Sequence, residues 1–233
     1  MAVTKTKKPL GNSKRMRASN EHAVKAALPM QEAIAALRKF KATKFDQTVN
    51  VCFHLGIDPK AADQALRGSI ALPHGIGKSA RVIAFCGSDK VAAAKAAGAV
   101  EAGAEELVAK IEGGWMDFDV AVASPDMMRV VSKLGKVLGP KGLMPSPKAG
   151  TVTPNVPEAV KEYAAGKQEY RNDDAGNVHG VIGKMSFSDD KLVDNLNAFV
   201  QAILKAKPST AKGTYVKKCV VAGCMSPGVP VAV

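Results

Sequence analysis

The chain has 233 residues, a formal net charge of +12, and 46% hydrophobic but only 5% aromatic residues. This length allows one large domain or two ordinary ones, and the apolar content is that of a globular protein. No apolar segment approaches the length of a membrane-spanning helix, so the sequence predicts no membrane partner.

The positive charge is concentrated at the two ends of the chain. Residues 76–165 contain 11 Lys and Arg against 10 Asp and Glu, whereas the remaining residues contain 22 against 11. If the two ends fold together, they form a strongly basic unit, which is typical of proteins that bind a polyanion. Colloidal solubility is the alternative explanation, and it requires no partner.

The first twenty residues contain Lys and Arg but no acidic residue. No apolar run follows them, so they are not a secretory signal. The Lys bias, Pro9 and Gly11 predict a flexible basic arm, with a mitochondrial presequence as the alternative.

A helix is predicted over residues 30–40 and a strand over residues 45–55. In this strand Val49, Val51, Phe53 and Leu55 alternate with Thr48, Asn50, Cys52 and His54, so one face is apolar and the other polar. By the same alternation Phe45 falls on the apolar face, which favours a core position. An exposed aromatic beside Lys44 is the alternative, because such a side chain stacks on a base or ribose.

The middle of the chain alternates strand and helix signals. Residues 81–86 and 118–123 read as strands. Ser88 is placed to cap a helix that ends at Gly98, residues 104–111 predict a second helix, and Ser124-Pro125-Asp126 opens a third. This order predicts parallel βαβ units in a Rossmann-like three-layer α/β domain.

Residues 133–152 are rich in Gly, Pro and Lys. No acidic residue occurs from residue 127 to residue 157, so four lysines are unopposed there: Lys133, Lys136, Lys141 and Lys148. Gly and Pro interrupt the segment too often for a regular core element, so we expect a surface loop that meets phosphate.

Residues 178–187 and 214–221 predict two further strands, with a helix beginning at Asp189 between them. Together with residues 30–55 these elements predict a split βαβ layer. We therefore expect an α/β, overall α+β, chain of two domains. Residues 1–75 plus 166–233 form the discontinuous basic domain, and residues 76–165 form the inserted domain. Pro73 to Gly75 and Gly166 are the expected hinge positions.

Signals for catalysis, cofactors and metals are weak. Gly77-Lys78-Ser79 resembles the end of a phosphate-binding loop, but Leu72 stands where its first Gly is required. No dinucleotide fingerprint, catalytic constellation, or cysteine pair at zinc-site spacing is present. The sequence predicts no enzyme activity, no cofactor and no metal. Cys52 and Cys86 are expected to be buried.

Several long blocks resemble one family. They read KFDQTVNVCFHLGIDPKAADQALRGSIALPHGIGK, GWMDFDVAVASPDMMRVVSKLGKVLGPKGLMPSPKAGTVT, EYRNDDAGNVHGVIGKMSF and AKPSTAKGTYVKK, and they cover most of the chain between residues 44 and 218. This order and length resemble the large-subunit ribosomal stalk protein, ribosomal protein "L-one", in its bacterial form. The resemblance implies the same discontinuous first domain and inserted second domain.

The resemblance also implies an RNA-binding set, and it favours surface positions for Lys44 and Phe45. Whether His179 contacts RNA or is an ordinary surface histidine stays open. Where the family usually has Thr-Met-Gly, this chain has Cys224, Met225 and Ser226, and Asn50 stands where many members have Glu. The complete expected set is Lys44, Phe45, Thr48, Asn50, Arg171, His179, Lys184, Ser186, Lys212, Thr214, Cys224, Met225 and Ser226. Lys133, Lys136, Lys141 and Lys148 form a secondary basic surface.

The implied function is that of a structural protein of the large ribosomal subunit. Its partners would be ribosomal RNA at the mobile stalk, exit-site tRNA, the mRNA of its own operon, and other ribosomal components. We expect a monomer when free, in the bacterial cytoplasm, with an organellar ribosome as the alternative. The competing functions are a non-ribosomal RNA-binding factor and a nucleotide-using enzyme built on the α/β middle.

Overall fold

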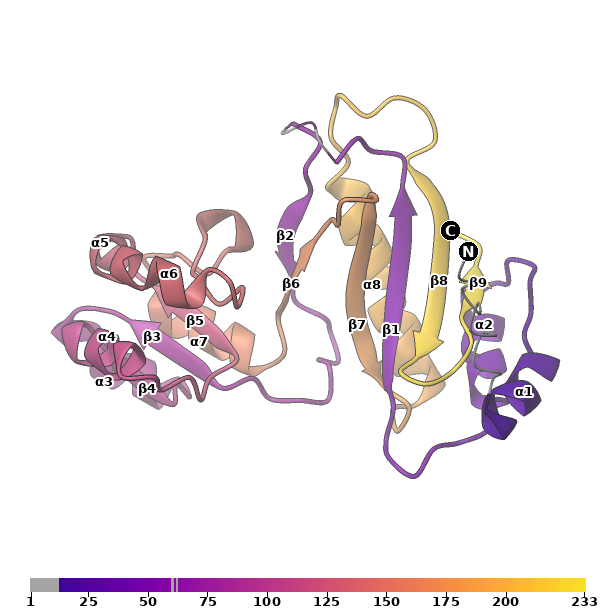
Figure 1. Cartoon of the computed structure of the whole chain (residues 1–233), viewed down its shortest axis with the longest axis horizontal. Helices are drawn as coiled ribbons and strands as arrows, with labels where there is room; N and C mark the ends of the chain where they lie inside the picture. The colour runs from indigo at the N-terminus through magenta and orange to yellow at the C-terminus, as the bar shows by residue number, and fades with distance from the viewer. Residues whose placement is uncertain (1–12, 60, 62) are drawn as a thin grey trace, which may run out of the picture.

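The computed structural model describes residues 13–233 except 60 and 62, and the chain is of mixed α/β class. Figure 1 shows two groups of elements connected by the strands β2 (Arg67–Ile70) and β6 (Gln168–Arg171). One group contains both ends of the described chain, and the other contains its middle. The division into two domains at residues 75 and 166 stays a prediction.

The terminal segments share one four-stranded antiparallel sheet. Its strands are β7 (Asn177–Lys184), β1 (Thr48–Leu55), β8 (Val216–Gly223) and β9 (Val229–Val231), in that spatial order. Because β7 and β8 are both antiparallel to β1, they run parallel to each other on either side of it. Helix α8 (Asp189–Lys205) connects them, so this is a split βαβ unit.

One face of this sheet is covered by helices. The alternating residues Val49, Val51, Phe53 and Leu55 are at most 1% exposed, and they pack with apolar residues of α8 and of α2 (Met30–Arg38). The rings of Phe53 and Phe199 stack with centroids 5.6 Å apart. In Figure 1, α8 lies behind the sheet and the opposite face is turned toward the viewer without a helix over it.

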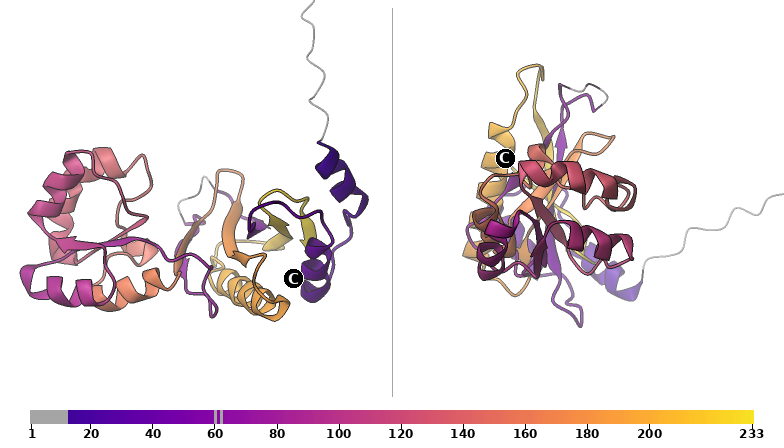
Figure 2. Two further views of the ribbon diagram at one scale, coloured as in Figure 1. Left: turned by 90° about the horizontal axis from the view of Figure 1, so that it is seen from below. Right: turned by 90° about the vertical axis from the view of Figure 1, so that its left-hand side faces the viewer.

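The middle of the chain contains a parallel sheet of three strands in the order β4 (Glu101–Gly103), β3 (Val82–Phe85), β5 (Val120–Ala123). Successive residues of β3 point to opposite faces of the sheet, and both faces are buried. Ile83 and Phe85 pack with α4 (Glu105–Glu112) and α5 (Met128–Val131), whereas Val82 and Ala84 pack with α3 (Ser88–Ala96) and α7 (Val156–Ala164). Figure 2 shows these helices on both sides of the strands.

The chain passes between the two groups twice, and these two connecting segments lie side by side. β2 pairs with β6 in antiparallel register, with Arg67 opposite Arg171. Gly75 and Gly166 both have positive φ, 62° and 108°, and a Cβ added to Gly166 would lie 3.5 Å from the Cα of Gly75. Only glycine adopts such φ values readily, so these two residues allow both strands of chain to turn at one place.

The expectation of a purely irregular loop over residues 133–152 is wrong. Short helical segments occupy Ser132–Leu134, Gly135–Leu138 and Pro147–Ala149. Leu134 and Leu138 are spaced four residues apart and are fully buried against the parallel sheet, because helical turns place such residues on one face. The four lysines of the segment are exposed, as expected for a surface.

The amino-terminal prediction needs a similar correction. Lys14–Glu21 forms the helix α1, and the Oγ of Ser13 accepts a hydrogen bond of 3.3 Å from the N–H of Met16. The rest of the expected basic arm, residues 1–12, lies outside the described residues. Elsewhere, Gly87 rather than Ser88 holds the cap position of α3, and Pro125 begins a 3₁₀ turn, Pro125–Met127, rather than a regular helix.

Candidate nucleic-acid interface

The uncovered face of the antiparallel sheet is polar along its central strand. Thr48, Asn50, Cys52 and His54 lie on the side of β1 opposite to the buried residues, and each is exposed or half-buried. In register, Thr48 lies opposite Lys184, and Cys52 lies opposite His179. On the other side of β1, His54 lies opposite Lys218. Three strands therefore present polar and basic groups on one surface.

The β8–β9 loop closes on one end of this surface, which we call the Met225 end (residues 43–48, 184–186 and 223–228). The N–H of Cys224 donates to the carbonyl oxygen of Thr48 at 3.0 Å. The N–H of Met225 donates to the Oε1 of Gln47, also at 3.0 Å. With its main chain fixed in this way, the Met225 side chain is 47% exposed.

Phe45 belongs to the same end, and the core position that alternation alone favoured for it is wrong. Its side chain is 49% exposed, because β1 begins only at Thr48 and the strand alternation does not extend back to residue 45. Gln47, 7% exposed, is the residue buried immediately before the strand. The hydroxyl of Thr43 donates to the carbonyl oxygen of Phe45 at 2.8 Å and holds this turn. The surface position beside the exposed Lys44, which the resemblance favoured, agrees with this geometry.

Ser186 joins this end through Asp46. The N–H and the Oγ–H of Ser186 donate to the two carboxylate oxygens of Asp46, at 3.1 and 2.8 Å. Ser226 closes the β8–β9 turn, since its Oγ accepts the N–H of Gly223 at 2.8 Å. Eight predicted residues therefore lie at the Met225 end: Lys44, Phe45, Thr48, Lys184, Ser186, Cys224, Met225 and Ser226.

The opposite end of the surface is organised by Asp173. This carboxylate accepts the N–H groups of Asn177 and Ala175 at 2.7 and 2.9 Å, and the amide of Asn177 at 3.0 Å. The hydrogen bonds from Asn177, with that from Ala175 and the nearby His179 as smaller contributions, hold the pKa of Asp173 below its usual range. His179 Nε2 lies 3.7 Å from Asp173, and His54 Nδ1 lies 2.8 Å from the Oδ1 of Asn177.

Arg171, Lys212 and Thr214 lie at this Asp173 end. Arg171 is exposed on β6, next to the bridge between Asn172 and Val178. Lys212 and Thr214 are exposed in the segment before β8, where the carbonyl oxygen of Tyr215 accepts the N–H of Gly56 at 2.7 Å. The eight residues of β1 separate the two ends by about 26 Å, at roughly 3.3 Å per residue. The predicted residues thus form a strip with two ends rather than one compact cluster.

The lysines of the secondary basic surface lie away from this strip, in the middle group of elements. Lys133, Lys136, Lys141 and Lys148 are all exposed, on the short helical segments and turns between residues 132 and 149. The structure therefore separates two basic surfaces.

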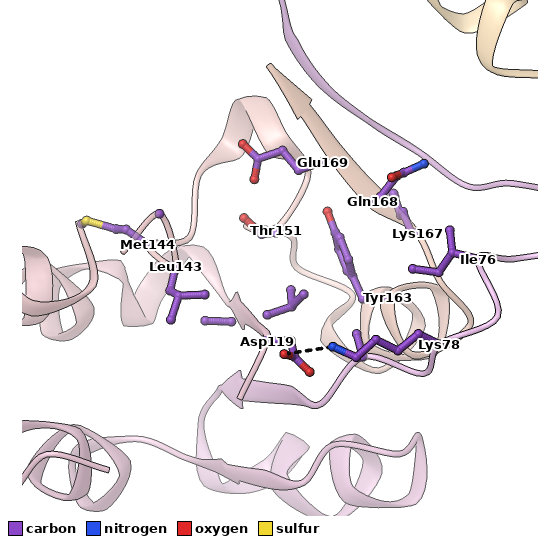
Figure 3. A pocket seen from close by; sticks show the side chains of 14 residues that line it. Ile76, Lys78, Asp119, Leu143, Met144, Thr151, Tyr163, Lys167, Gln168 and Glu169 are labelled. Carbon is purple, nitrogen blue, oxygen red and sulfur yellow. Dashed lines mark hydrogen bonds and ion pairs between the residues drawn. The ribbon is translucent and has the colours of Figure 1, made fainter. Parts of the chain in front are cut away.

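The sequence Gly77-Lys78-Ser79 forms no phosphate-binding loop. Lys78 lines a cavity of about 320 Å³ that is bounded by residues of the middle group and by residues 167–169, and its Nζ is 3.5 Å from a carboxylate oxygen of Asp119 (Figure 3). The main-chain N–H of Arg81 donates to the same carboxylate, and this bond, together with the Arg81 and Lys78 charges, lowers the pKa of Asp119. The element that follows this sequence is the strand β3 and not a helix, so the loop-to-helix arrangement of a phosphate-binding loop is absent here.

The cysteines are free thiols with different environments. Burial raises the pKa of Cys219 to about 12, and Cys86 is also buried. Cys52 is only half-buried, on the polar face of β1, which corrects the prediction that it is buried. Within residues 13–233, leaving out 60 and 62, no three His, Cys, Asp or Glu side chains form a group that would hold a metal ion.

Sequence reasoning missed the residues that position this surface. Gln47 and Asp46 hold Met225 and Ser186 in place, and the guanidinium of Arg15 on α1 donates to the carbonyl oxygen of Met225 at 2.6 Å. Each of these contacts joins segments more than 130 residues apart, so no local pattern indicates them. Lys218 also belongs to this surface and was not predicted, although it lies in the predicted strand 214–221.

A polar, basic sheet face with an exposed aromatic at one end is the surface of an RNA-binding protein, because bases and riboses stack on such side chains while lysines contact phosphates. Comparison with protein families agrees with this class. The model of the Ribosomal protein L1p/L10e family matches residues 37–227, and the chain belongs to this family.

Family membership makes the protein a structural component of the large ribosomal subunit that binds ribosomal RNA and serves translation. Its place is therefore the ribosome. No helix in the described part of the chain combines the length and apolar character needed to cross a bilayer.

Proposed function

We propose that the strip between the Met225 end and the Asp173 end binds ribosomal RNA at the mobile stalk of the large subunit. The observation that supports this most directly is the coincidence of charge and shape. Residues outside 76–165 contain 22 Lys and Arg against 11 Asp and Glu. Segments of this part of the chain build the four-stranded antiparallel sheet, whose polar face carries no helix in Figure 1. Phe45 and Met225 stand exposed at one end of that face.

The residues of the strip divide into two roles. Lys44, Lys184, Lys212 and Arg171 supply affinity for phosphates that does not depend on sequence. Phe45 and Met225 contact a base or ribose, and the short polar side chains bind ribose hydroxyls and base edges. These polar contacts are made by Thr48, Asn50, His179, Ser186, Thr214, Cys224 and Ser226.

We propose further that residues 76–165 form an inserted domain with a separate partner. Its net charge is close to neutral, yet Lys133, Lys136, Lys141 and Lys148 are exposed on one segment without acidic neighbours in sequence. This basic segment suits transient contact with exit-site tRNA during its release. The paired crossings at Gly75 and Gly166 are the expected hinge between this domain and the rest of the chain.

Repression of the mRNA of its own operon is the second proposed activity of the strip. An mRNA that copies the stalk fold would occupy the same face, so rRNA and mRNA would compete for one site. In this scheme the free protein is a monomer and acts without catalysis, and the bacterial cytoplasm is its proposed location.

Chemical footprinting on large subunits that lack the protein tests the stalk assignment. Added protein should co-sediment with the subunits and protect one contiguous region of the stalk RNA. Protection elsewhere would refute the stalk as its site, and a failure to co-sediment would favour a non-ribosomal RNA-binding role. A filter-binding assay with labelled ATP and GTP tests the enzyme alternative, and we expect no retention.

A further inference from the structure

The helix α1 adds positive charge at the edge of the polar sheet face. In both views of Figure 2, α1, drawn in indigo, lies on the side of the sheet away from α8. Residues 13–20 include Lys14, Arg15 and Arg17 and no acidic residue. Because Arg15 contacts the loop between β8 and β9, this basic helix is joined to the Met225 end.

Arg15 is oriented by a neutral group. Its Nη1 donates to the carbonyl oxygen of Met225 at 2.6 Å. A carbonyl oxygen fixes the direction of a guanidinium without cancelling its charge. The guanidinium carries several N–H donors, and this bond uses one of them, so others remain for a partner. The side chain is half-buried, which leaves part of it accessible.

Other arginines of the terminal segments have their charge balanced within the protein. Arg38 forms an ion pair with Asp189, and Arg67 forms one with Glu169 at 2.6 Å. Arg15 differs, since among the described residues no carboxylate lies within ion-pair distance of it. Its positive charge is therefore both fixed in position and left uncompensated.

The place of Arg15 beside Met225 indicates which anion would compensate this charge. The exposed side chain of Met225 is proposed to contact a base or ribose of the RNA. Each ribose within an RNA chain is linked to a phosphate on both sides, so a phosphate lies close to any such contact. The planar guanidinium matches phosphate oxygens through paired N–H bonds, which favours phosphate as the partner of Arg15.

We infer that Arg15 binds a phosphate of the RNA chain that passes over Met225, so that α1 belongs to the RNA interface. The inference rests on the proposed binding of RNA to this face. Residue 225 then has two effects. Its side chain contacts one nucleotide, and its carbonyl oxygen orients the cation that contacts the adjoining phosphate.

The salt dependence of affinity for a stalk fragment of large-subunit ribosomal RNA separates this role from a purely structural one. Each neutralised phosphate contributes about 0.7–0.9 to the slope of the logarithm of the association constant against the logarithm of salt concentration. Arg15→Gln in the full-length protein should make the slope shallower by this amount and weaken binding roughly tenfold. If Arg15 only held the loop, affinity would fall while the slope stayed the same.

Two further variants serve as controls. Arg15→Lys keeps the charge, so the slope should equal that of the unmodified protein, although loss of the planar fork should weaken binding about threefold. Lys205→Gln removes the same charge from an exposed position on α8, behind the sheet, and should change neither slope nor affinity. The apolar core described for the terminal segments includes no residue of α1, so the Arg15 variants should keep the melting temperature.

An unchanged slope for Arg15→Gln, with or without a loss of affinity, would overturn the inference. So would an equal change of slope in Lys205→Gln, because the effect would then follow net charge rather than a contact. Both results leave the proposed function standing, since the unmodified protein still binds the fragment in a salt-dependent way. Failure of the unmodified protein to bind it would refute the proposed function itself, and the inference with it.

Discussion

The main-chain N–H of Met225 donates a 3.0 Å hydrogen bond to the side-chain oxygen of Gln47, a residue 178 positions earlier in the chain. The guanidinium of Arg15 donates a 2.6 Å hydrogen bond to the carbonyl oxygen of Met225. Two segments far apart in sequence therefore meet at this loop, and each of them fixes a main-chain atom of Met225. The side chain of Met225 is left exposed, as expected for a group that contacts a partner.

Met225→Ala should weaken binding to ribosomal RNA by about 1–2 kcal/mol, the cost of a lost buried apolar contact. The melting temperature should not change, because both the N–H and the carbonyl oxygen of residue 225 keep their partners. Leu204→Ala is the matched control. Leu204 is 49% exposed on α8, which covers the other face of the sheet, so its truncation should leave affinity unchanged. A lower melting temperature with unchanged affinity would make the loop a structural cap only.

The two departures from the usual Thr-Met-Gly pattern should behave differently. Cys224→Thr should preserve or tighten RNA binding, because the exposed position gains a hydroxyl that reaches a ribose 2′-OH. Ser226→Gly should instead weaken binding by about 1 kcal/mol, since the N–H of Gly223 loses the acceptor that closes the turn. Dissociation constants and melting temperatures of the two single variants would show this split. Equal effects would mean that the Ser226 hydroxyl does not shape the loop.

Asp173 should make stability depend on pH. Its pKa is held below the ordinary value by the hydrogen bonds from Asn177, so it stabilises the fold above the unfolded pKa of about 3.9 and loses this effect as pH falls through the folded pKa. Asp173→Asn should therefore lower the melting temperature at pH 7, and the difference from the unmodified protein should shrink toward pH 2. A difference that persists at pH 2 would assign the effect to packing.

The proposed domain division is tested by joining residues 1–75 to residues 166–233 through a short linker. The crossings at Gly75 and Gly166 are adjacent, so this junction requires little rearrangement, and the terminal segments keep their own core. The joined protein should fold and keep most of the affinity for ribosomal RNA. Residues 76–165 alone should bind it poorly. The reverse result would contradict the assignment of the RNA site to the terminal segments.

Sequence patterns predicted the elements in which the buried residues recur at a regular spacing within one segment. The alternation from Val49 to Leu55 identified β1 and its buried face, and the apolar residues after Asp189 identified α8. Strands β2 and β6 were not predicted, because Arg67–Ile70 and Gln168–Arg171 are short and acquire their order only by pairing with each other across about 100 residues. The helical turns at Leu134 and Leu138 were missed because Gly and Pro dominate the surrounding composition.

The candidate site was predictable only in part. The lysines and the loop at Met225 were predicted from the resemblance. The exposure of Phe45 depends on where β1 begins, and alternation alone placed its side chain on the buried face. Gln47, Asp46 and Arg15 position the site through contacts with residues far away in sequence. Such residues are ordinary in composition and local pattern, and three-dimensional structure is needed to find them.

The most direct test of RNA binding by the basic terminal segments is the salt dependence of affinity for a stalk fragment of large-subunit ribosomal RNA. If about five phosphates are neutralised, the logarithm of the association constant should fall with the logarithm of salt concentration at a slope of about −3.5 to −4.5, at roughly 0.7–0.9 per phosphate. A slope near zero would show that the positive charge of the terminal segments serves solubility only, and would contradict the proposed interface.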